Sequence, residues 1–356
     1  MTTRDILEFL QQVQHPAKGD RSISDLGMLE DVIITEDKIS VTIVFSKHRD
    51  PLAEYLIGST RAVLIRNAPD HEIEVKTRVK EEPKPQEQPK KAGLDLGLEE
   101  LVNIKHIIGV ASGKGGVGKS TVAVNLAIAL SKLGYKVGLA DADVYGPSVP
   151  KMTGTEDVLP EAILEDEKEI ILPIEKYGVK WMSIGYFSKP DQALIWRGPM
   201  ACNALKQMIL QVRWGELDFL LIDMPPGTGD IHISLVHDIP MSGAIIVSTP
   251  QDVAILDVEK GVSMFRNKDI NKPIYGLVEN MAWFTPEELP NNKYFIFGKD
   301  GGLKMAEKYD IPLLGQIPIV QTIREGADNG EPSALGTNPD AVAFLNLASS
   351  LVENIQ

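Results

Sequence analysis

The stretch from Gly113 to Thr121 constrains the fold of this chain more than any other part of its sequence. It reads Gly-Lys-Gly-Gly-Val-Gly-Lys-Ser-Thr, and the spacing G-x-x-x-x-G-K-S is that of a phosphate-binding loop, whose glycines let backbone N–H groups approach phosphate oxygens. The apolar run at 106–111 predicts a buried parallel strand before the loop, and apolar residues at helical spacing over 121–133 predict a helix after it. We therefore expect the loop to end at a helix N-terminus, where the backbone favours an anion.

Each residue type in the loop suits one part of a nucleotide. Lys119 is expected to neutralise the β and γ phosphates, and the Ser120 hydroxyl is placed to ligate Mg²⁺. The alternative is a glycine-rich turn that packs a helix on a strand and binds nothing, but the strand and helix patterns on both sides favour phosphate binding. The predicted nucleotide contacts in the loop are Gly113, Lys114, Gly115, Gly116, Val117, Gly118, Lys119, Ser120 and Thr121.

Carboxylates follow two further predicted strands. Asp141 and Asp143 come after the strand at 136–140, at the edge where parallel sheets bind ligands. A ligand site is therefore expected at this pair, and a pair of turn-forming aspartates is the alternative. Asp223 ends another apolar strand and is expected to hold Mg²⁺ through its water shell. The proline- and glycine-rich residues 224–230 are a candidate switch segment near the γ phosphate.

The length of the chain predicts more than one domain, because 356 residues exceed what a single hydrophobic core usually serves. Residues 1–79 are expected to form a small α+β domain. Alternating strand and helix patterns predict a doubly wound, mostly parallel α/β domain over residues 101–356. Between them, residues 80–100 are rich in charge and proline, so we expect an extended linker.

The composition restricts the possible partners and compartments. With 36 basic and 50 acidic side chains the net charge is −14, so binding of nucleic acid through bulk charge is not expected. No apolar stretch reaches transmembrane length and residues 339–356 contain no Lys or Arg, which argues against membrane binding. The N-terminus lacks the pattern of a signal peptide, and the single cysteine, Cys202, suits a reducing compartment, so a cytoplasmic location is expected.

These motifs together resemble a known family. The loop with its early Lys114, the string Asp-Ala-Asp-Val-Tyr-Gly-Pro-Ser from Asp141 and the string Asp-Met-Pro-Pro-Gly-Thr-Gly-Asp from Asp223 resemble the deviant phosphate-loop ATPases, and among them the iron–sulfur cluster carriers of the Mrp, ApbC and Nbp35 type. Residues 1–79 resemble the MIP18-like (DUF59) domain that is often fused to Mrp proteins. The resemblance implies an ATPase that converts ATP and water to ADP and phosphate and serves iron–sulfur cluster assembly or transfer.

The resemblance also implies roles for particular residues and partners. Asp143 would orient the attacking water or accept its proton, and Asp141 would help organise Mg²⁺ or the surrounding loop. The resemblance implies a homodimer with ATP–Mg²⁺ between the subunits, in which Lys114 reaches the partner's nucleotide as an arginine finger does; a solvated surface lysine is the alternative. Asn280, at the end of a predicted strand, would recognise the adenine edge, while a turn-forming asparagine is the alternative. Apoprotein clients or other iron–sulfur assembly proteins are the implied partners.

One departure from the family pattern bears on the cluster itself. The carriers place a C-x-x-C pair shortly after the string Glu-Asn-Met, so that two subunits bridge one cluster with four thiolates. Residues 281–298 contain no cysteine, and Cys202 lies far away in sequence, where we expect a buried or half-buried thiol. The carboxylates of Glu287 and Glu288 would suit a hard ion better than a cluster. Two hypotheses therefore stay open, a carrier of an iron–sulfur cluster and a nucleotide-gated adaptor or scaffold that binds no cluster itself.

Overall fold

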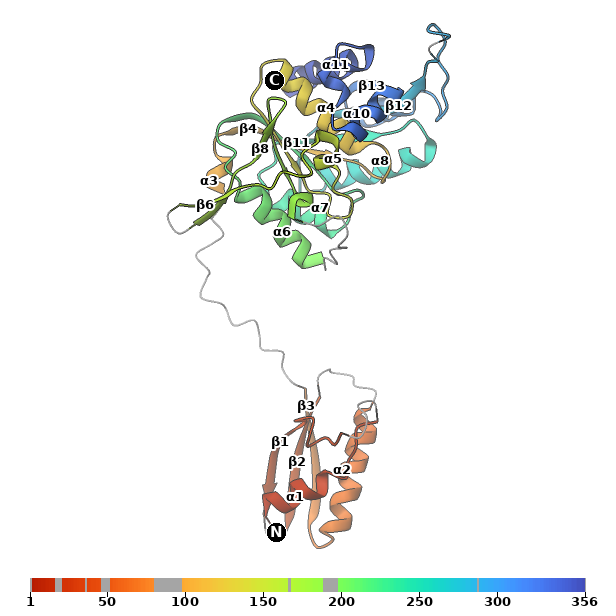
Figure 1. Cartoon of the computed structure of the whole chain (residues 1–356). Coiled ribbons are helices and arrows are strands. Elements are labelled where there is room, and N and C mark those ends of the chain that lie inside the picture. The colour runs from red at the N-terminus through yellow and green to blue at the C-terminus, as the bar shows by residue number, and fades with distance from the viewer. Residues whose placement is uncertain are drawn as a thin grey trace. The chain divides into compact units, whose positions relative to one another are not determined.

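The chain forms two compact units, Met1–Ala92 and Gly93–Gln356 (Figure 1). The computed structural model describes residues 2–16, 21–35, 37–45, 52–79, 98–165, 168–187, 198–286 and 288–355. The division between the units falls inside the predicted linker at 80–100. The finer predicted limits of the two domains stay predictions.

The smaller unit is an α+β fold. Its elements are α1 (Thr3–Leu10), β1 (Leu29–Ile34), β2 (Lys38–Phe45), α2 (Ala53–Asn67) and β3 (Glu72–Val79). The strand order is β1-β2-β3, with β1 and β2 antiparallel and β2 and β3 parallel. Helix α1 starts with a capping box between Thr2 and Asp5, which satisfies backbone N–H groups at its first turn. Ile6 of α1 and Leu56 of α2 lie in the same hydrophobic core as Val41 of β2.

The larger unit is built on an eight-stranded sheet, with the order β13-β12-β11-β4-β10-β5-β9-β8. All neighbouring strands are parallel except β8 and β9. The strands are β4 (Ile104–Ala111), β5 (Val137–Asp141), β8 (Ile174–Lys176), β9 (Val179–Ser183), β10 (Leu217–Asp223), β11 (Gly243–Ser248), β12 (Ile274–Phe284) and β13 (Leu313–Ile319), and β6 (Ala162–Glu165) and β7 (Lys168–Ile171) form a separate two-stranded ribbon. The predicted doubly wound, mostly parallel sheet is confirmed.

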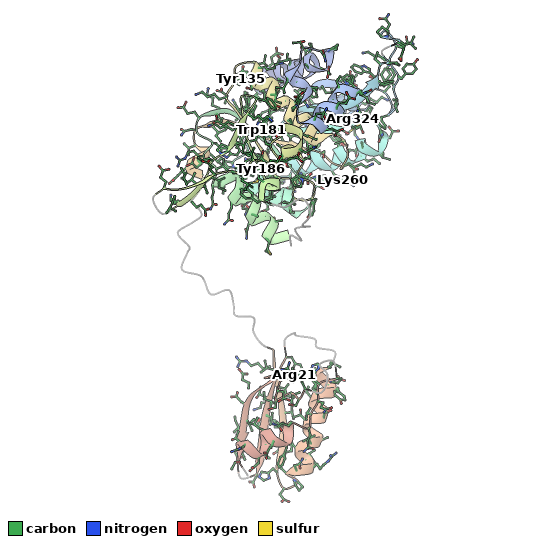
Figure 2. The ribbon with its side chains drawn as sticks, viewed as in Figure 1. Arg21, Tyr135, Trp181, Tyr186, Lys260 and Arg324 are labelled. Atoms are coloured by element: carbon green, nitrogen blue, oxygen red, sulfur yellow. The ribbon has the colours of Figure 1, made fainter. Side chains whose placement is uncertain are left out.

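Helices cover both faces of this sheet because successive strand residues point to opposite sides. The helices are α3 (Leu98–Leu101), α4 (Lys119–Lys132), α5 (Val149–Thr153), α6 (Gly198–Leu210), α7 (Asp230–Asp238), α8 (Asp252–Phe265), α9 (Gly301–Tyr309), α10 (Gln321–Asn329) and α11 (Pro339–Ile355). On β4, Ile107 packs in the core under α6, α7, α8 and α9, while the next residue, Ile108, packs in the core under α4 and α11. The fully buried Trp181 of β9, labelled in Figure 2, lies in the second of these cores.

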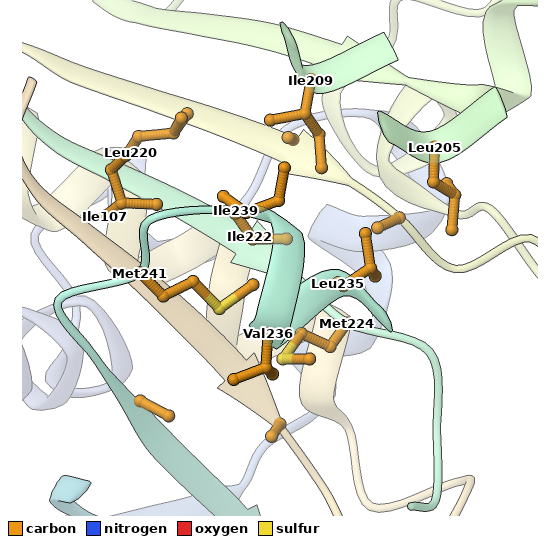
Figure 3. Close-up of a cluster of buried hydrophobic side chains, with 14 of the residues drawn as sticks. Ile107, Leu205, Ile209, Leu220, Ile222, Met224, Leu235, Val236, Ile239 and Met241 are labelled. Carbon is orange, nitrogen blue, oxygen red and sulfur yellow. The ribbon is translucent and has the colours of Figure 1, made fainter. Parts of the chain in front are cut away.

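Figure 3 shows how the helices α6 and α7 are held on their face of the sheet. Apolar side chains of both helices meet those of β4 and β10 in one buried cluster. The side chains labelled there are Ile107, Leu205, Ile209, Leu220, Ile222, Met224, Leu235, Val236, Ile239 and Met241. Only the segment 224–229 separates β10 from α7. The packing of α7 on the sheet therefore fixes both ends of this segment.

The strand register brings the predicted carboxylates together. Asp223, the last residue of β10, is paired with Asp141 of β5 on one side and with Val110 of β4 on the other. The segment that follows β4 leads into the phosphate loop. The loop and both aspartates therefore share the carboxyl edge of the sheet, which is where open α/β sheets bind ligands.

Candidate active site

The phosphate loop connects β4 to α4 and takes a shape that glycine permits. Gly116 and Gly118 have φ values of +82° and +80°, in the left-handed region that side chains rarely adopt. A Cβ atom at Gly118 would lie 2.2 Å from Nδ2 of Asn280, and one at Gly113 would lie 2.1 Å from the carbonyl oxygen of Asp257. The loop is therefore pressed between β12 and α8.

Helix α4 begins at Lys119, immediately after Gly118, and no described side chain caps its N-terminus. The first N–H groups of a helix have no partner within the helix and carry its positive partial charge. An uncapped N-terminus that follows a glycine-rich loop is a site for an anion such as a phosphate.

Lys119 lies among carboxylates at the start of this helix. Its Nζ atom is 2.5 Å from Oδ1 of Asp223 and 3.8 Å from Oδ2 of Asp143, and it donates to Oγ of Ser120 at 3.3 Å. The side chain is 6% exposed and that of Asp223 is fully buried. The structure thus brings together four of the residues that the sequence singled out. The ammonium group lies between the carboxylate of Asp223, which ends β10, and that of Asp143, in the loop after β5.

Asp141 is bound by the backbone around it. Its Oδ1 accepts the N–H of Asp143 at 3.1 Å, and its Oδ2 accepts the N–H of Val149 at 3.2 Å and the hydroxyl of Ser183 at 2.9 Å. Burial, and then the charge of Asp223, raise the pKa of Asp141 to about 7. These bonds tie β5, the loop after it and β9 together, which suits the expected role of Asp141 in organising the loop.

Asp223 has one oxygen without a partner. Oδ1 accepts the ammonium of Lys119, while the buried Oδ2 has no hydrogen bond among the described residues. Burial raises the pKa of Asp223, and the positive charge of Lys119 opposes that shift. A buried carboxylate oxygen that lacks a donor is suited to a cation or to its bound water.

The oxygen donors here fit Mg²⁺. Within the described part of the chain no group of three or more His, Cys, Asp or Glu side chains is arranged to hold a metal ion. Mg²⁺ is usually held in such sites by one or two protein oxygens together with waters and substrate phosphates. Ser120 and the free oxygen of Asp223 would supply the protein oxygens, and the ion would neutralise charge on the β and γ phosphates.

Asp143 and Asn280 complete the surroundings of the loop. Oδ1 of Asp143 accepts the N–H of Tyr145 at 3.2 Å, which leaves Oδ2 facing Lys119. Nδ2 of the buried Asn280 donates to the carbonyl oxygen of Val117 at 2.9 Å, so its amide supports the phosphate loop. The expected contact between Asn280 and adenine stays a prediction.

Comparison with known families gives the same assignment as this geometry. A family model described as the NUBPL iron-transfer P-loop NTPase matches residues 103–355. The chain belongs to this NUBPL family. A second model, described as an iron–sulfur cluster assembly protein, matches residues 3–76. The resemblance stated from the motifs is therefore confirmed, as is its P-loop NTPase fold.

Individual relatives of this NUBPL-family chain cover most of its length. It is 39% identical to an iron–sulfur cluster carrier protein from a Synechocystis species, over 96% of this chain and 94% of that protein. It is 49% identical to a protein of the same description from Aquifex aeolicus, over 72% of this chain and 70% of that protein. A solved nucleotide-binding protein in complex with ADP from Archaeoglobus fulgidus matches with a TM-score of 0.59 and 36% identity, over 70% of this chain and 95% of that chain.

Lys114 lies in the phosphate loop and is exposed. Its carbonyl oxygen accepts the hydroxyl of Ser112, but its ammonium makes no ion pair with any described residue. An exposed cation in the phosphate loop is thus available to a group outside the subunit. The expected action of Lys114 on the nucleotide of a partner subunit stays a prediction.

The segment around the end of β12 is the place where the resemblance led us to look for a C-x-x-C pair, and residues 281–298 contain no cysteine. Backbone hydrogen bonds of 2.9 and 2.8 Å pair Phe284 with Tyr294, and Nζ of Lys293 lies 3.7 Å from the ring centre of Trp283. Cys202 on α6 is half buried against the core, as expected for a structural thiol. Glu287 lies outside the described residues.

The helices were also considered as possible membrane spans. Among those in the described ranges, none combines the length and the apolar character that a span requires.

Sequence reasoning missed His232 in the first turn of α7. Its side chain is 1% exposed, and its Nε2 atom has no hydrogen-bond partner among the described residues. Burial, and then the positive charge of Lys119, lower the pKa of His232 to about 4. The signal available in the sequence was a histidine between two isoleucines, shortly after the switch segment.

Proposed function

We propose that this chain is an ATPase that couples ATP hydrolysis to the assembly or transfer of iron–sulfur clusters. The observation that carries the proposal is the position of Lys119, at an uncapped helix N-terminus and between the carboxylates of Asp143 and Asp223. Membership of the NUBPL family and relatives described as iron–sulfur cluster carrier proteins support the cluster part of the proposal.

The described residues suggest how the reaction is arranged. Binding of the triphosphate draws the ammonium of Lys119 from Asp223 toward the β and γ phosphates, because a phosphate carries more charge than the carboxylate it replaces. Asp223 is then free to hold the Mg²⁺ water shell together with Ser120. Asp143, beside Lys119, positions the attacking water. Charge that develops on the transferred phosphoryl group is met by Lys119 and by the backbone N–H groups of the loop.

We also propose that two copies form the working unit, with Lys114 of one subunit acting on the nucleotide of the other. Large apolar side chains are exposed at the carboxyl edge of the sheet and at the helix starts beside it. A second copy that covers this edge would bury them and would meet the unpaired Lys114. The exposed side chains are Tyr145, Met200, Ile233, Val253 and Leu256.

Phosphate release by the purified protein tests the ATPase part of the proposal. With ATP and Mg²⁺ we expect steady release of inorganic phosphate that stops when EDTA removes the metal. Light scattering coupled to gel filtration should show a dimer when a slowly hydrolysed ATP analogue is present. A monomer that releases no phosphate under any of these conditions would contradict the proposal.

A second candidate function is a nucleotide-gated adaptor that binds no cluster. It is favoured by the absence of cysteine from residues 281–298. Anaerobic incubation with iron and sulfide separates the two functions. Iron and sulfide retained per dimer after desalting would support a carrier, whereas ATP hydrolysis without any retained iron would support the adaptor.

A further inference from the structure

Two buried polar atoms in the larger unit have no partner, and both belong to residues that flank the segment 224–229. Within the described part of this unit, the buried side-chain nitrogen and oxygen atoms without a hydrogen bond are Oδ2 of Asp223 and Nε2 of His232. Asp223 ends β10 and His232 lies in the first turn of α7. A buried polar group that lacks a partner destabilises a fold, so each such group in a native protein calls for a physical reason.

Packing alone does not account for the histidine. Helix α7 is held on the sheet by Leu235, Val236 and Ile239, which are buried in the cluster of Figure 3. An apolar side chain of similar size at position 232 would fill the same space without an unpaired nitrogen. The place of His232 in the chain points instead to the nucleotide site, because α7 begins after the short segment that follows Asp223. The positive charge of Lys119 also contributes to the lowered pKa of His232.

The arrangement around Lys119 also shows which group is missing. In the structure Lys119 is bound to Asp223, and a bound triphosphate would bring phosphate oxygens and magnesium-bound waters to this place. Phosphate oxygens accept hydrogen bonds, whereas a magnesium-bound water donates them. A neutral imidazole has one N–H group, and the Nε2–H tautomer of His232 could donate to a phosphate oxygen.

We propose that His232 is a positioning residue of the nucleotide cycle. In the triphosphate-bound state its Nε2–H group donates a hydrogen bond to a phosphate oxygen of the nucleotide. This bond joins the first turn of α7 to the occupied site and holds the segment 224–229 in its reactive position. After phosphate leaves, Nε2 is again without a partner and α7 is released.

The inference rests on the proposed function, because it requires a nucleotide beside Lys119. The role of the buried neutral imidazole is to donate a hydrogen bond and not to transfer a proton. Its removal should therefore slow turnover more than it weakens ATP binding.

Steady-state ATP hydrolysis by the full-length protein tests the inference with three variants. His232→Leu removes the donor at similar volume and should lower kcat about tenfold with KM for ATP nearly unchanged, as expected for the loss of one oriented hydrogen bond. His232→Gln keeps an N–H group near the position of Nε2 and should stay within about threefold of wild type. His237→Leu, on the exposed side of the same helix, should match wild type.

A thermal-shift experiment tests the contact with phosphate. We expect a slowly hydrolysed ATP analogue to raise the melting temperature of wild type more than ADP does, and His232→Leu to lose this difference. The loss should occur both with Mg²⁺ and with EDTA, because the acceptor is a phosphate oxygen. A loss confined to Mg²⁺ would contradict this hydrogen bond.

The outcomes that overturn the inference are distinct from those that overturn the proposed function. If wild type hydrolyses ATP, and His232→Leu keeps both its kcat and the difference between analogue and ADP, the inference is wrong and the ATPase assignment stands. If His232→Leu does not fold, the pair His232→Gln and His232→Asn replaces it. The amide of Gln reaches the position of Nε2, whereas the amide of Asn reaches only the position of Nδ1. Equal turnover by these two variants contradicts the inference. A wild type that binds no nucleotide overturns both.

Discussion

At the scale of single residues, Lys119 has two possible partners, the carboxylate of Asp223 and the phosphates of a nucleotide. The first is seen in the structure, with Nζ 2.5 Å from Oδ1 of a fully buried carboxylate. Burying one charge without the other is costly, so the pair stabilises this edge of the sheet while the site holds no nucleotide. The same contact sets a barrier to nucleotide binding, because the ammonium must leave Asp223 to reach the phosphates.

Replacing Lys119 tests its role in turnover. Lys119→Ala should lower ATP hydrolysis at least about a hundredfold, because it removes the main positive charge beside the transferred phosphoryl group. Lys304→Ala, at an exposed position of α9, is the matched control and should hydrolyse ATP like wild type. Circular dichroism shows whether the variant is folded, and a folded Lys119→Ala with normal phosphate release would contradict the site.

The raised pKa of Asp141 predicts a specific pH dependence of stability. The carboxyl group has a pKa of about 7 in the folded protein and about 3.8 when unfolded, so the folded state binds its proton more tightly. Its contribution to the free energy of unfolding is therefore largest at low pH and falls as the pH rises between these two values. The variant Asp141→Asn cannot ionise at this position, so its free energy of unfolding should not show this fall with pH.

Urea unfolding at pH 5, 6 and 7.5 in EDTA measures the effect. At pH 5 Asp141→Asn should be less stable than wild type by about 1 kcal/mol, because one acceptor of a backbone N–H becomes a donor. The gap should narrow as the pH rises. Asp328→Asn, at an exposed position, should show a gap that does not change with pH, and the same constancy for Asp141→Asn would show that Asp141 is ionised throughout.

At the scale of elements, the phosphate loop depends on β12 as much as on the two elements it connects. The amide of Asn280 donates to the carbonyl of Val117 at 2.9 Å, and the lack of a side chain at Gly118 makes room for that amide. Asn280 is followed by Met281, whose φ of +57° is unusual for a residue with a side chain. Backbone strain of this kind next to a binding loop is typical of functional sites.

A pair of glycine substitutions separates the contact with Asn280 from backbone strain. Gly118→Ala should both weaken nucleotide binding and lower stability, because its Cβ would lie 2.2 Å from Nδ2 of Asn280. Gly134 has a similar φ, +94°, but a Cβ added there would meet no described heavy atom within 4 Å. Gly134→Ala should therefore lower the free energy of unfolding by only about 1 kcal/mol, through backbone strain.

Calorimetric titration with ADP and thermal melting are the measurements for this pair. Gly134→Ala should bind ADP like wild type. Adding Asn280→Ala to Gly118→Ala should recover part of the lost stability, because the smaller side chain removes the clash. Normal ADP binding by Gly118→Ala would show that the loop does not depend on its contact with β12.

At the scale of the whole molecule, Lys114 predicts that the active site is shared between two subunits. If Lys114 acts on the partner's nucleotide, Lys114→Ala and Lys119→Ala subunits should be inactive separately and should recover activity when mixed. Each mixed dimer then has one site with both lysines, so a one-to-one mixture should reach about a quarter of wild-type turnover. Lys114→Ala should also lose hydrolysis more than ATP binding.

Phosphate release before and after unfolding and refolding of the mixed subunits is the measurement. A mixture of wild type with Lys119→Ala controls for the effect of mixing itself. No recovery in the mixture of the two variants, with dimers present, would place Lys114 in the site of its own subunit. Equal loss of binding and hydrolysis in Lys114→Ala would lead to the same correction.

The sequence by itself determined the features that depend on local spacing. The loop from Gly113 to Thr121, the strand before it and the helix after it follow from residue types at fixed intervals, and so does the placement of Asp141 and Asp223 at strand ends. The alternation of strands and helices was sufficient to predict a parallel sheet with helices on both faces. These features were predictable because each depends on backbone preferences within a short stretch of chain.

Only the tertiary structure decided which distant groups meet. It joined Lys119 to a carboxylate at the end of β10, placed the amide of Asn280 against the loop, and buried Nε2 of His232 without a hydrogen-bond partner among the described residues. Sequence patterns could not supply these contacts, because a strand order such as β4-β10-β5 brings together segments far apart in the chain. Burial then changes their chemistry, since a charge or an N–H group removed from water must find its partner inside the protein.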